Sequence, residues 1–298
     1  MLSLHTNSAA LSAQSSISRT QSNLSTSQTR LSTGYRVNSA MDDAAGLQIA
    51  TRLKAQTSGM AMAMRNTQNS ISMLQTGEGA LDETTTILVR MKDLATQSAD
   101  ASSTDDDRVA MQAEFDALSN ELSNIVGNTS FGGTALFKDT DGTFTAALNF
   151  QIGAGTEEKM SVDLSTSVSD MNDKIVLAAT KFVSTGAAGD AGVVAGGAAG
   201  TEIDKDTANA TIDLLKDAID AVGTLRSALG AVANRLDHVY NNLQNISSNT
   251  TAATGRIMDT DFAAESSNMT SSQMLLQAGT AMLKQSNSTS SLVMSLLQ

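Results

Sequence analysis

The chain has 298 residues, a formal net charge of −12 at pH 7, 41% hydrophobic residues and only 3% aromatic residues. The negative charge disfavours binding to nucleic acids and to anionic membranes, because both repel an acidic surface. The absence of cysteine excludes disulfides and thiolate metal sites, and the absence of proline favours long, uninterrupted helices.

The N-terminal 33 residues are polar, with 15 Ser or Thr, but a thin apolar seam runs through them. Two rows show a spacing of seven residues: Ala10, Ile17, Leu24 and Leu31 on one, and Leu4 with Leu11 on the other. This spacing predicts a helix that needs a partner, since alone it buries too little apolar surface to offset its ordering entropy.

From about residue 42 the pattern predicts a long helix of the coiled-coil type, with an interruption near Gly77 and Gly79. Its row of seven-residue spacing comprises Leu53, Met60, Thr67, Leu74, Leu81, Leu88 and Ala95. A second amphipathic helix is predicted from the segment STDDD at 103–107 as far as Gly127. An N-cap candidate and three acids stand at its start, where negative charge favours the helix dipole.

Residues 131–164 change period and predict β-hairpins, because residues 144–152 alternate between apolar and polar. The segment at 186–200 is almost entirely Gly and Ala, which favours an exposed connection. From about 206 to 246 apolar residues recur every three or four positions and predict a strong coiled-coil helix. After a polar break near 247–255, a final helix carries a thin seam that includes Leu275, Ala278 and Met282.

Residues for chemistry are scarce. His5 and His238 are the only histidines and lack the spacing of a zinc hydrolase, so a half-buried structural role for His238 is favoured over a catalytic one. Asp42 and Asp43 are adjacent, so on a helix they point about 100° apart and cannot share a proton or a metal. The sequence therefore predicts no enzyme, no metal site and no cofactor.

Five blocks of the sequence identify a family. They are LSTGYRVNSAMDDAAGLQIATRL at 31–53, TGEGALDE at 76–83, LVRMKDLATQSA at 88–99, TLRSALGAVANRL at 224–236 and QAGTAMLKQSN at 277–287. In order and position they resemble the terminal regions of bacterial flagellins, over roughly 1–138 and 206–298. The middle of the chain does not resemble the family.

The expected fold is mainly α: long coiled-coil helices from both termini packed as a rod-like bundle, with a small β-hairpin region in the middle. The resemblance implies that 1–42 and 255–298 form an inner core that lines the filament channel and is disordered in the monomer. Residues 43–178 and 205–254 would form the outer core, with β-hairpins at about 131–165. Residues 179–204 would be a short variable Gly/Ala-rich segment in place of an outer domain.

The implied function is that of a structural subunit that self-assembles into the extracellular flagellar filament through coupled folding of its terminal helices. The expected polymerisation seam consists of Leu4, Leu11, Ile17, Leu24, Leu31, Leu275, Ala278, Met282, Leu292 and Leu296. Its partners would be other copies of the chain, the filament cap and the hook-junction proteins, and an export chaperone on the C-terminal helix.

The N-terminus resembles no secretory signal and no long apolar run is present, so the usual routes would leave the chain in the cytoplasm. The resemblance replaces that expectation with type III export, without a cleaved signal peptide. It also implies recognition by innate immune receptors. Arg90, Leu94 and Glu114 match the surface read by the animal Toll-like receptor. The epitope read by the plant receptor kinase is matched by Gly34, Asn38, Asp42, Asp43 and Gly46.

Three alternatives remain at this point: a hook–filament junction protein, a flagellin with a peptidase in its middle segment, and a cytoplasmic coiled-coil adaptor. The absence of histidine between 6 and 237 disfavours the peptidase. Residues 31–53 are expected to join two helices. Gly34 would end the first in a left-handed turn, Ser39 with Asp42 would cap the second, and Gly46 would allow close approach of a neighbouring backbone.

Overall fold

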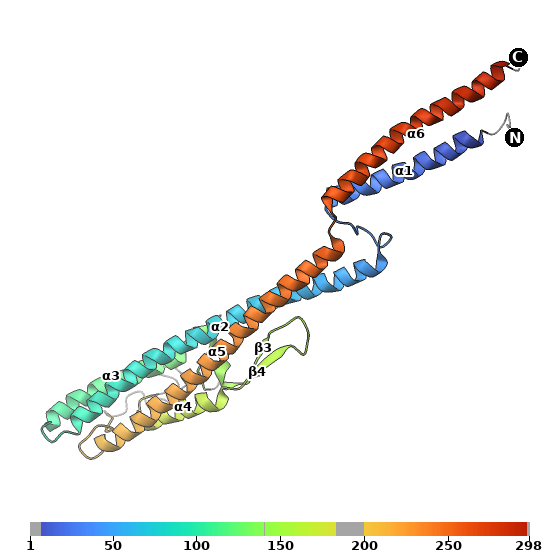
Figure 1. Cartoon of the computed structure of the whole chain (residues 1–298). Coiled ribbons are helices and arrows are strands. Elements are labelled where there is room, and N and C mark those ends of the chain that lie inside the picture. The colour runs from blue at the N-terminus through green and yellow to red at the C-terminus, as the bar shows by residue number, and fades with distance from the viewer. Residues whose placement is uncertain (1–6, 140, 183–199, 297–298) are drawn as a thin grey trace. The chain divides into compact units, whose positions relative to one another are not determined.

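The computed structural model describes residues 7–139, 141–182 and 200–296, with side chains described as far as 289 (Figure 1). The chain divides into two compact units, which we call unit 1 (1–57 and 247–298) and unit 2 (58–246). Six helices dominate the described residues and confirm the mainly α prediction: α1 Ser8–Thr33, α2 Ala44–Ser98, α3 Asp105–Asn128, α4 Ser165–Ala178, α5 Ala208–Met258 and α6 Phe262–Leu296.

Helix α1 is closed at both ends by local chemistry. The Asn7 side chain accepts a hydrogen bond from the Ala10 amide at 3.1 Å, which satisfies one free amide of the first turn. Gly34 ends the helix with φ at 76° and donates its amide to the carbonyl of Arg30 at 2.8 Å. The predicted left-handed stop at Gly34 is confirmed, since few residues other than glycine adopt this φ without strain.

Helix α2 runs through Gly77 and Gly79, so the predicted interruption is wrong. A Cβ atom at Gly77 would lie 2.7 Å from the Phe144 ring and 3.2 Å from the Phe137 ring. Gly77 therefore makes room for a buried aromatic pair, while Gly79 is exposed and a Cβ atom there would have no neighbour within 4 Å. The predicted row from Met60 to Ala95 is buried, as expected of a helix face on a core.

Helix α3 begins as predicted. The Thr104 side chain accepts the Asp107 amide at 3.2 Å and the Asp107 carboxylate accepts the Thr104 amide at 3.0 Å, which makes a reciprocal capping box. Helix α5 continues to Met258, so the predicted polar break near 247–255 is wrong. That stretch contains no proline and only one glycine, and its Ser, Thr and Asn residues remain helical.

The predicted β-region is smaller than expected. Two hairpins form: β1 Ser130–Phe131 pairs antiparallel with β2 Thr134–Ala135, and β3 Leu148–Gln151 pairs antiparallel with β4 Lys159–Val162. Phe144, expected in a strand, lies in a 3₁₀ turn at Thr143–Thr145. There its ring is fully buried against Phe137, with ring centroids 5.3 Å apart and an interplanar angle of 66°. Burial of this aromatic pair outweighs the strand preference that the alternating pattern indicated.

The hydrophobic core of unit 2 is formed by faces of α2, α3, α4 and α5. Helix α4 was not predicted, although Val168, Met171 and Ile175 are spaced by three and four and are completely buried. Two residues of the predicted variable segment, Phe182 and Ile203, are also buried in this core. Residues 183–199 lie outside the described residues.

Candidate functional site

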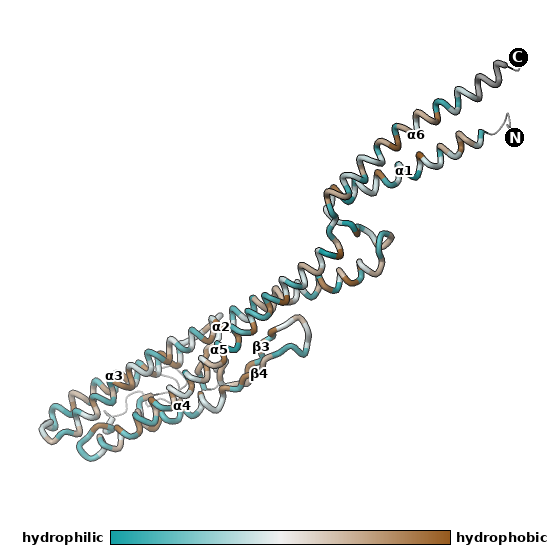
Figure 2. Tube along the Cα trace, viewed as in Figure 1, coloured by the Kyte–Doolittle hydropathy of each residue, from teal (hydrophilic) through white to brown (hydrophobic). Residues whose placement is uncertain are grey.

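Helices α1 and α6 lie side by side in unit 1 (Figure 1). The face of α1 toward α6 is made by residues spaced three and four apart: Ala10, Ala13, Ile17, Thr20, Leu24, Ser27 and Leu31. The corresponding row of α6 comprises Glu265, Met269, Ser272, Leu276, Gly279, Leu283 and Ser286. Most of these side chains are half-buried, and about half are small or polar. The seam between the helices is therefore thin, as the mixed hydropathy along α1 also indicates (Figure 2).

Polar contacts at its two ends and one close approach set the register of this helix pair. The Asn7 side-chain amide donates to the carbonyl and hydroxyl of Ser286 at 3.3 and 3.2 Å. Toward the other end, an Arg30 guanidinium nitrogen lies 3.8 Å from the carboxylate of buried Glu265. Between them, a Cβ atom at Gly279 would lie 2.9 Å from Ile17, so glycine is needed there. A sliding of one helix along the other would break all three contacts.

The residues predicted for the polymerisation seam lie differently on the two helices. Ile17, Leu24 and Leu31 lie on the row that faces α6, whereas Leu11 is 62% exposed. On α6, Leu275 and Met282 are 61% and 69% exposed, and Ala278 is exposed with them. The predicted residues of α6 therefore lie on a row next to the one that faces α1. The row that pairs is marked by Gly279, which permits close approach. Leu4 lies outside the described residues, as do the side chains of Leu292 and Leu296.

The exposed residues of α6 form an apolar stripe of their own. We call Met274, Leu275, Ala278 and Met282 the outer stripe; Met274 is 59% exposed. Scattered exposed apolar residues are ordinary, but a stripe at helical spacing along one face usually marks a surface that another molecule covers.

A short crossing joins α1 and α6 to the rest of unit 1. Tyr35 and Asp259 form an antiparallel bridge. The Arg36 amide donates to the Met258 carbonyl at 2.6 Å, and the Thr260 amide donates to the Gly34 carbonyl at 3.0 Å. The two chain segments that leave α1 and α5 are thus hydrogen-bonded to each other, which fixes how they connect to α2 and α6.

The turn before α2 explains why two adjacent aspartates are present. Asp42 accepts the amides of Asn38 and Ser39 at 3.1 and 2.8 Å, and these hydrogen bonds lower its pKa below the usual value of 3.8. Asp43, not Ser39, caps α2, because its carboxylate accepts the Gly46 amide at 2.8 Å. A Cβ at Gly46 would lie 2.3 Å from that carboxylate. The predicted roles of Ser39 and Gly46 are therefore corrected: Gly46 makes room for its own helix cap.

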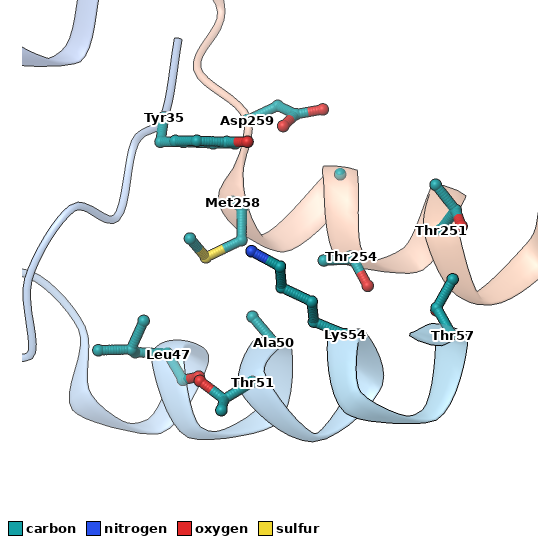
Figure 3. A pocket seen from close by; sticks show the side chains of 11 residues that line it. Tyr35, Leu47, Ala50, Thr51, Lys54, Thr57, Thr251, Thr254, Met258 and Asp259 are labelled. Atoms are coloured by element: carbon teal, nitrogen blue, oxygen red, sulfur yellow. The ribbon is translucent and has the colours of Figure 1, made fainter. Parts of the chain in front are cut away.

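A groove of about 430 Å³ lies between the first turns of α2 and the last turns of α5 (Figure 3). Its floor and walls are largely apolar, and Lys54 extends across it toward Met258. The lining residues are Tyr35, Leu47, Ala50, Thr51, Lys54, Thr57, Thr251, Thr254, Gly255, Met258 and Asp259. All of them belong to unit 1.

The residues predicted to contact the animal receptor differ in their solvent exposure. Arg90 and Glu114 are 54% and 46% exposed and form an ion pair at 2.6 Å between α2 and α3. Leu94 is 2% exposed and belongs to the core. Contrary to the prediction, it does not lie on the surface. Of the plant-receptor residues, Asn38 and Asp42 are exposed, while Gly46 is buried.

The described residues contain no group of three or more His, Asp or Glu side chains placed to hold a metal ion. Within the same part of the chain, no helix combines the length and apolar character that crossing a membrane requires.

Comparison with known proteins decides the family. The profile of the bacterial flagellin N-terminal helical region matches residues 4–142, and that of the C-terminal helical region matches residues 212–297. The chain belongs to the bacterial flagellin family. Flagellin B of Vibrio anguillarum is 33% identical over 377 aligned residues, which cover 99% of each chain. Polar flagellin A of Vibrio parahaemolyticus is 34% identical with the same coverage.

A solved structure shares the fold at lower identity. A putative flagellar hook-associated protein from Vibrio parahaemolyticus superposes with a TM-score of 0.54 at 15% identity, over 73% of this chain and 100% of the other. This likeness concerns the fold alone. The full-length matches are to flagellins, so the junction-protein alternative is not favoured.

As a flagellin, the chain is a structural subunit of the extracellular flagellar filament. This corrects the cytoplasmic expectation drawn from the N-terminus. The alignments are longer than this 298-residue chain, so these relatives carry additional residues. The two profiles leave 143–211 unmatched, which includes the short segment predicted to replace an outer domain.

Proposed function

We propose that this flagellin polymerises by completing the fold of its terminal helices on the filament, and that the outer stripe of α6 is the surface covered by neighbouring subunits. The exposure of Leu275 and Met282 in the single chain is the observation that carries this proposal. Burial of one such side chain contributes about 1.5–3 kcal/mol, and the contribution repeats at every subunit added.

The thin α1/α6 seam supplies the second half of the argument. Helices that meet through Ala, Ser, Thr and Gly bury little apolar surface, while ordering them costs roughly 1–2 kcal/mol per residue in backbone entropy alone. The pair is therefore expected to be disordered in the free monomer and ordered by its neighbours, with the energy of association driving the folding. Residues 1–42 and 255–298 would then form the inner core that lines the filament channel.

The decisive variants change charge on the two exposed faces of one helix. Leu275→Glu with Met282→Glu should abolish filament growth from purified monomer, since carboxylates would enter an apolar contact. Gln273→Glu with Gln277→Glu adds the same charge at exposed positions outside the outer stripe and should polymerise. Electron microscopy and sedimentation would measure filament growth, and equal polymerisation of the two double variants would refute the assignment of the stripe.

A deletion tests the requirement for the helix pair. Removal of residues 270–298 should leave a soluble, helical monomer that cannot polymerise, because unit 2 keeps its own core. Circular dichroism would verify the helix content of unit 2. Filaments formed by the truncated chain would contradict the proposal.

The same exposed stripe gives a reason to expect an export chaperone. Before export, an apolar α6 surface would need a shielding chaperone, and a chain without disulfides or proline suits passage through a type III channel without a cleaved signal peptide. On the filament, its neighbours would include the cap and the hook-junction proteins. For innate immune receptors, Arg90 and Glu114 offer an exposed polar surface and residues 34–46 an epitope.

A further inference from the structure

We infer that the groove between α2 and α5 receives the turn around Met41 from a second copy of this chain. The inference rests on the proposed polymerisation and assigns one contact within it. Two features of unit 1 have no partner among the described residues: an apolar groove and an exposed apolar tip.

Met41 is the tip. Its side chain is 97% exposed, the highest value among the large hydrophobic residues described, and it projects from the turn at residues 39–43. The turn is rigid, because Asp42 accepts hydrogen bonds from the backbone of Asn38 and Ser39, and Asp43 caps α2. A flexible methionine side chain on a hydrogen-bonded turn offers apolar surface with little loss of backbone entropy on binding.

The groove fits such a tip. Ala50 is 4% exposed and forms a small-residue floor, with Leu47 and Met258 half-buried beside it. The volume of about 430 Å³ lies in the range that accommodates small ligands, and one unbranched thioether chain fits within it.

Charge favours the same occupant. Lys54 extends across the groove (Figure 3), and it makes no ion pair with any described residue. Asp42 and Asp43 directly follow Met41 and would bring negative charge beside this ammonium group. A chain of net charge −12 gains specificity from such a pairing, since most other approaches place like charges together.

The contact is heterologous, because the tip and the groove are different surfaces. A tip that enters the groove of the next copy leaves that copy's tip and the first copy's groove free. Such a contact propagates along a polymer and does not close into a dimer.

The absence of native cysteine allows a clean test in the full chain. Met41→Cys and Thr51→Cys are prepared as separate proteins, mixed in equal amounts, polymerised and gently oxidised. Each chain holds one thiol, so a disulfide between positions 41 and 51 can form only between copies. We expect this link, identified by mass spectrometry of the peptides, in the polymer and not in the unpolymerised mixture. Met62→Cys, a 50% exposed methionine in unit 2, replaces Met41→Cys as the control and should give no link to position 51.

A binding measurement complements the cross-link. Met41→Ser removes the apolar tip and should raise the critical concentration for polymerisation about tenfold or more, and Met62→Ser should leave it within about twofold. Filaments that form without the 41–51 link would overturn the inference while leaving the proposed function intact. Failure of the unmodified chain to polymerise would overturn both.

Discussion

Gly77 offers a sharp test of how the core of unit 2 is packed, because Gly79 provides a control two residues away on the same helix. Replacement of either glycine by alanine within a helix removes backbone freedom from the unfolded chain and contributes roughly 0.5–1 kcal/mol of stability. At Gly79 a Cβ atom would meet nothing within 4 Å, so Gly79→Ala should stabilise by that amount.

At Gly77 the same methyl group would meet the Phe144 ring at 2.7 Å and the Phe137 ring at 3.2 Å. Both rings are completely buried and cannot move aside without disturbing their edge-to-face contact. Overpacking of this kind costs about 1–3 kcal/mol, which outweighs the gain in helix propensity. Gly77→Ala should therefore destabilise by about 0.5–2 kcal/mol.

The measurement is urea denaturation followed by circular dichroism on the monomer, with a melting curve as a second probe. Unit 2 spans residues 58–246, so each kcal/mol corresponds to a shift of about 2–4 °C in melting temperature. The two variants should move in opposite directions. Gly77→Ala combined with Phe144→Leu should cost less than the sum of the two single changes, since the smaller side chain relieves the overlap. Stabilisation of similar size by both alanine variants would refute the packing of this site.

Three other predictions follow from single contacts. Asp43→Ala removes the acceptor of the Gly46 amide and should destabilise the start of α2 by about 1 kcal/mol, measured by hydrogen exchange of residues 44–50; unchanged exchange would contradict the cap. Glu202→Ala removes the acceptor of the Thr180 amide and one of the two acceptors of the buried Gln112 side chain, which keeps its hydrogen bond to Asp116. This variant should cost about 1–3 kcal/mol in urea denaturation, whereas exposed Glu157→Ala should have little effect. Hydrogen bonds from Thr104 lower the pKa of Asp107 below 3.8, so their contribution is complete above the unfolded pKa and is lost as the pH falls through the lower folded pKa. Thr104→Ala should accordingly reduce stability at pH 7 and decrease the stability that is lost as the pH falls below 3.8, and an unchanged pH profile would count against the capping box.

Much of this fold follows from local patterns. The rows of α2 and α5, the acidic start of α3 and the left-handed stop at Gly34 all depend on residue periodicity and backbone chemistry, which act over a few residues. The ordered blocks at 31–53 and 224–236 were enough to indicate the flagellin family, because several independent blocks in the right order rarely coincide by chance.

Other features were decided by tertiary packing. The rings of Phe137 and Phe144 turned a predicted strand into a 3₁₀ turn and a predicted helix break at Gly77 into a close contact. On α6, two neighbouring rows have the same seven-residue spacing, and the contacts of Glu265, Gly279 and Ser286 determine which of them meets α1.

The joint at residues 34–46 shows the same division. Its residue types alone indicated a helix stop followed by a helix start. The long-range bridge between Tyr35 and Asp259 could not be inferred, because it joins segments more than 200 residues apart. Local sequence thus determined some of the helix ends, such as Gly34 and Thr104, and most of the apolar faces. The tertiary structure decided which apolar face is buried within the chain and which, like the outer stripe, stays exposed.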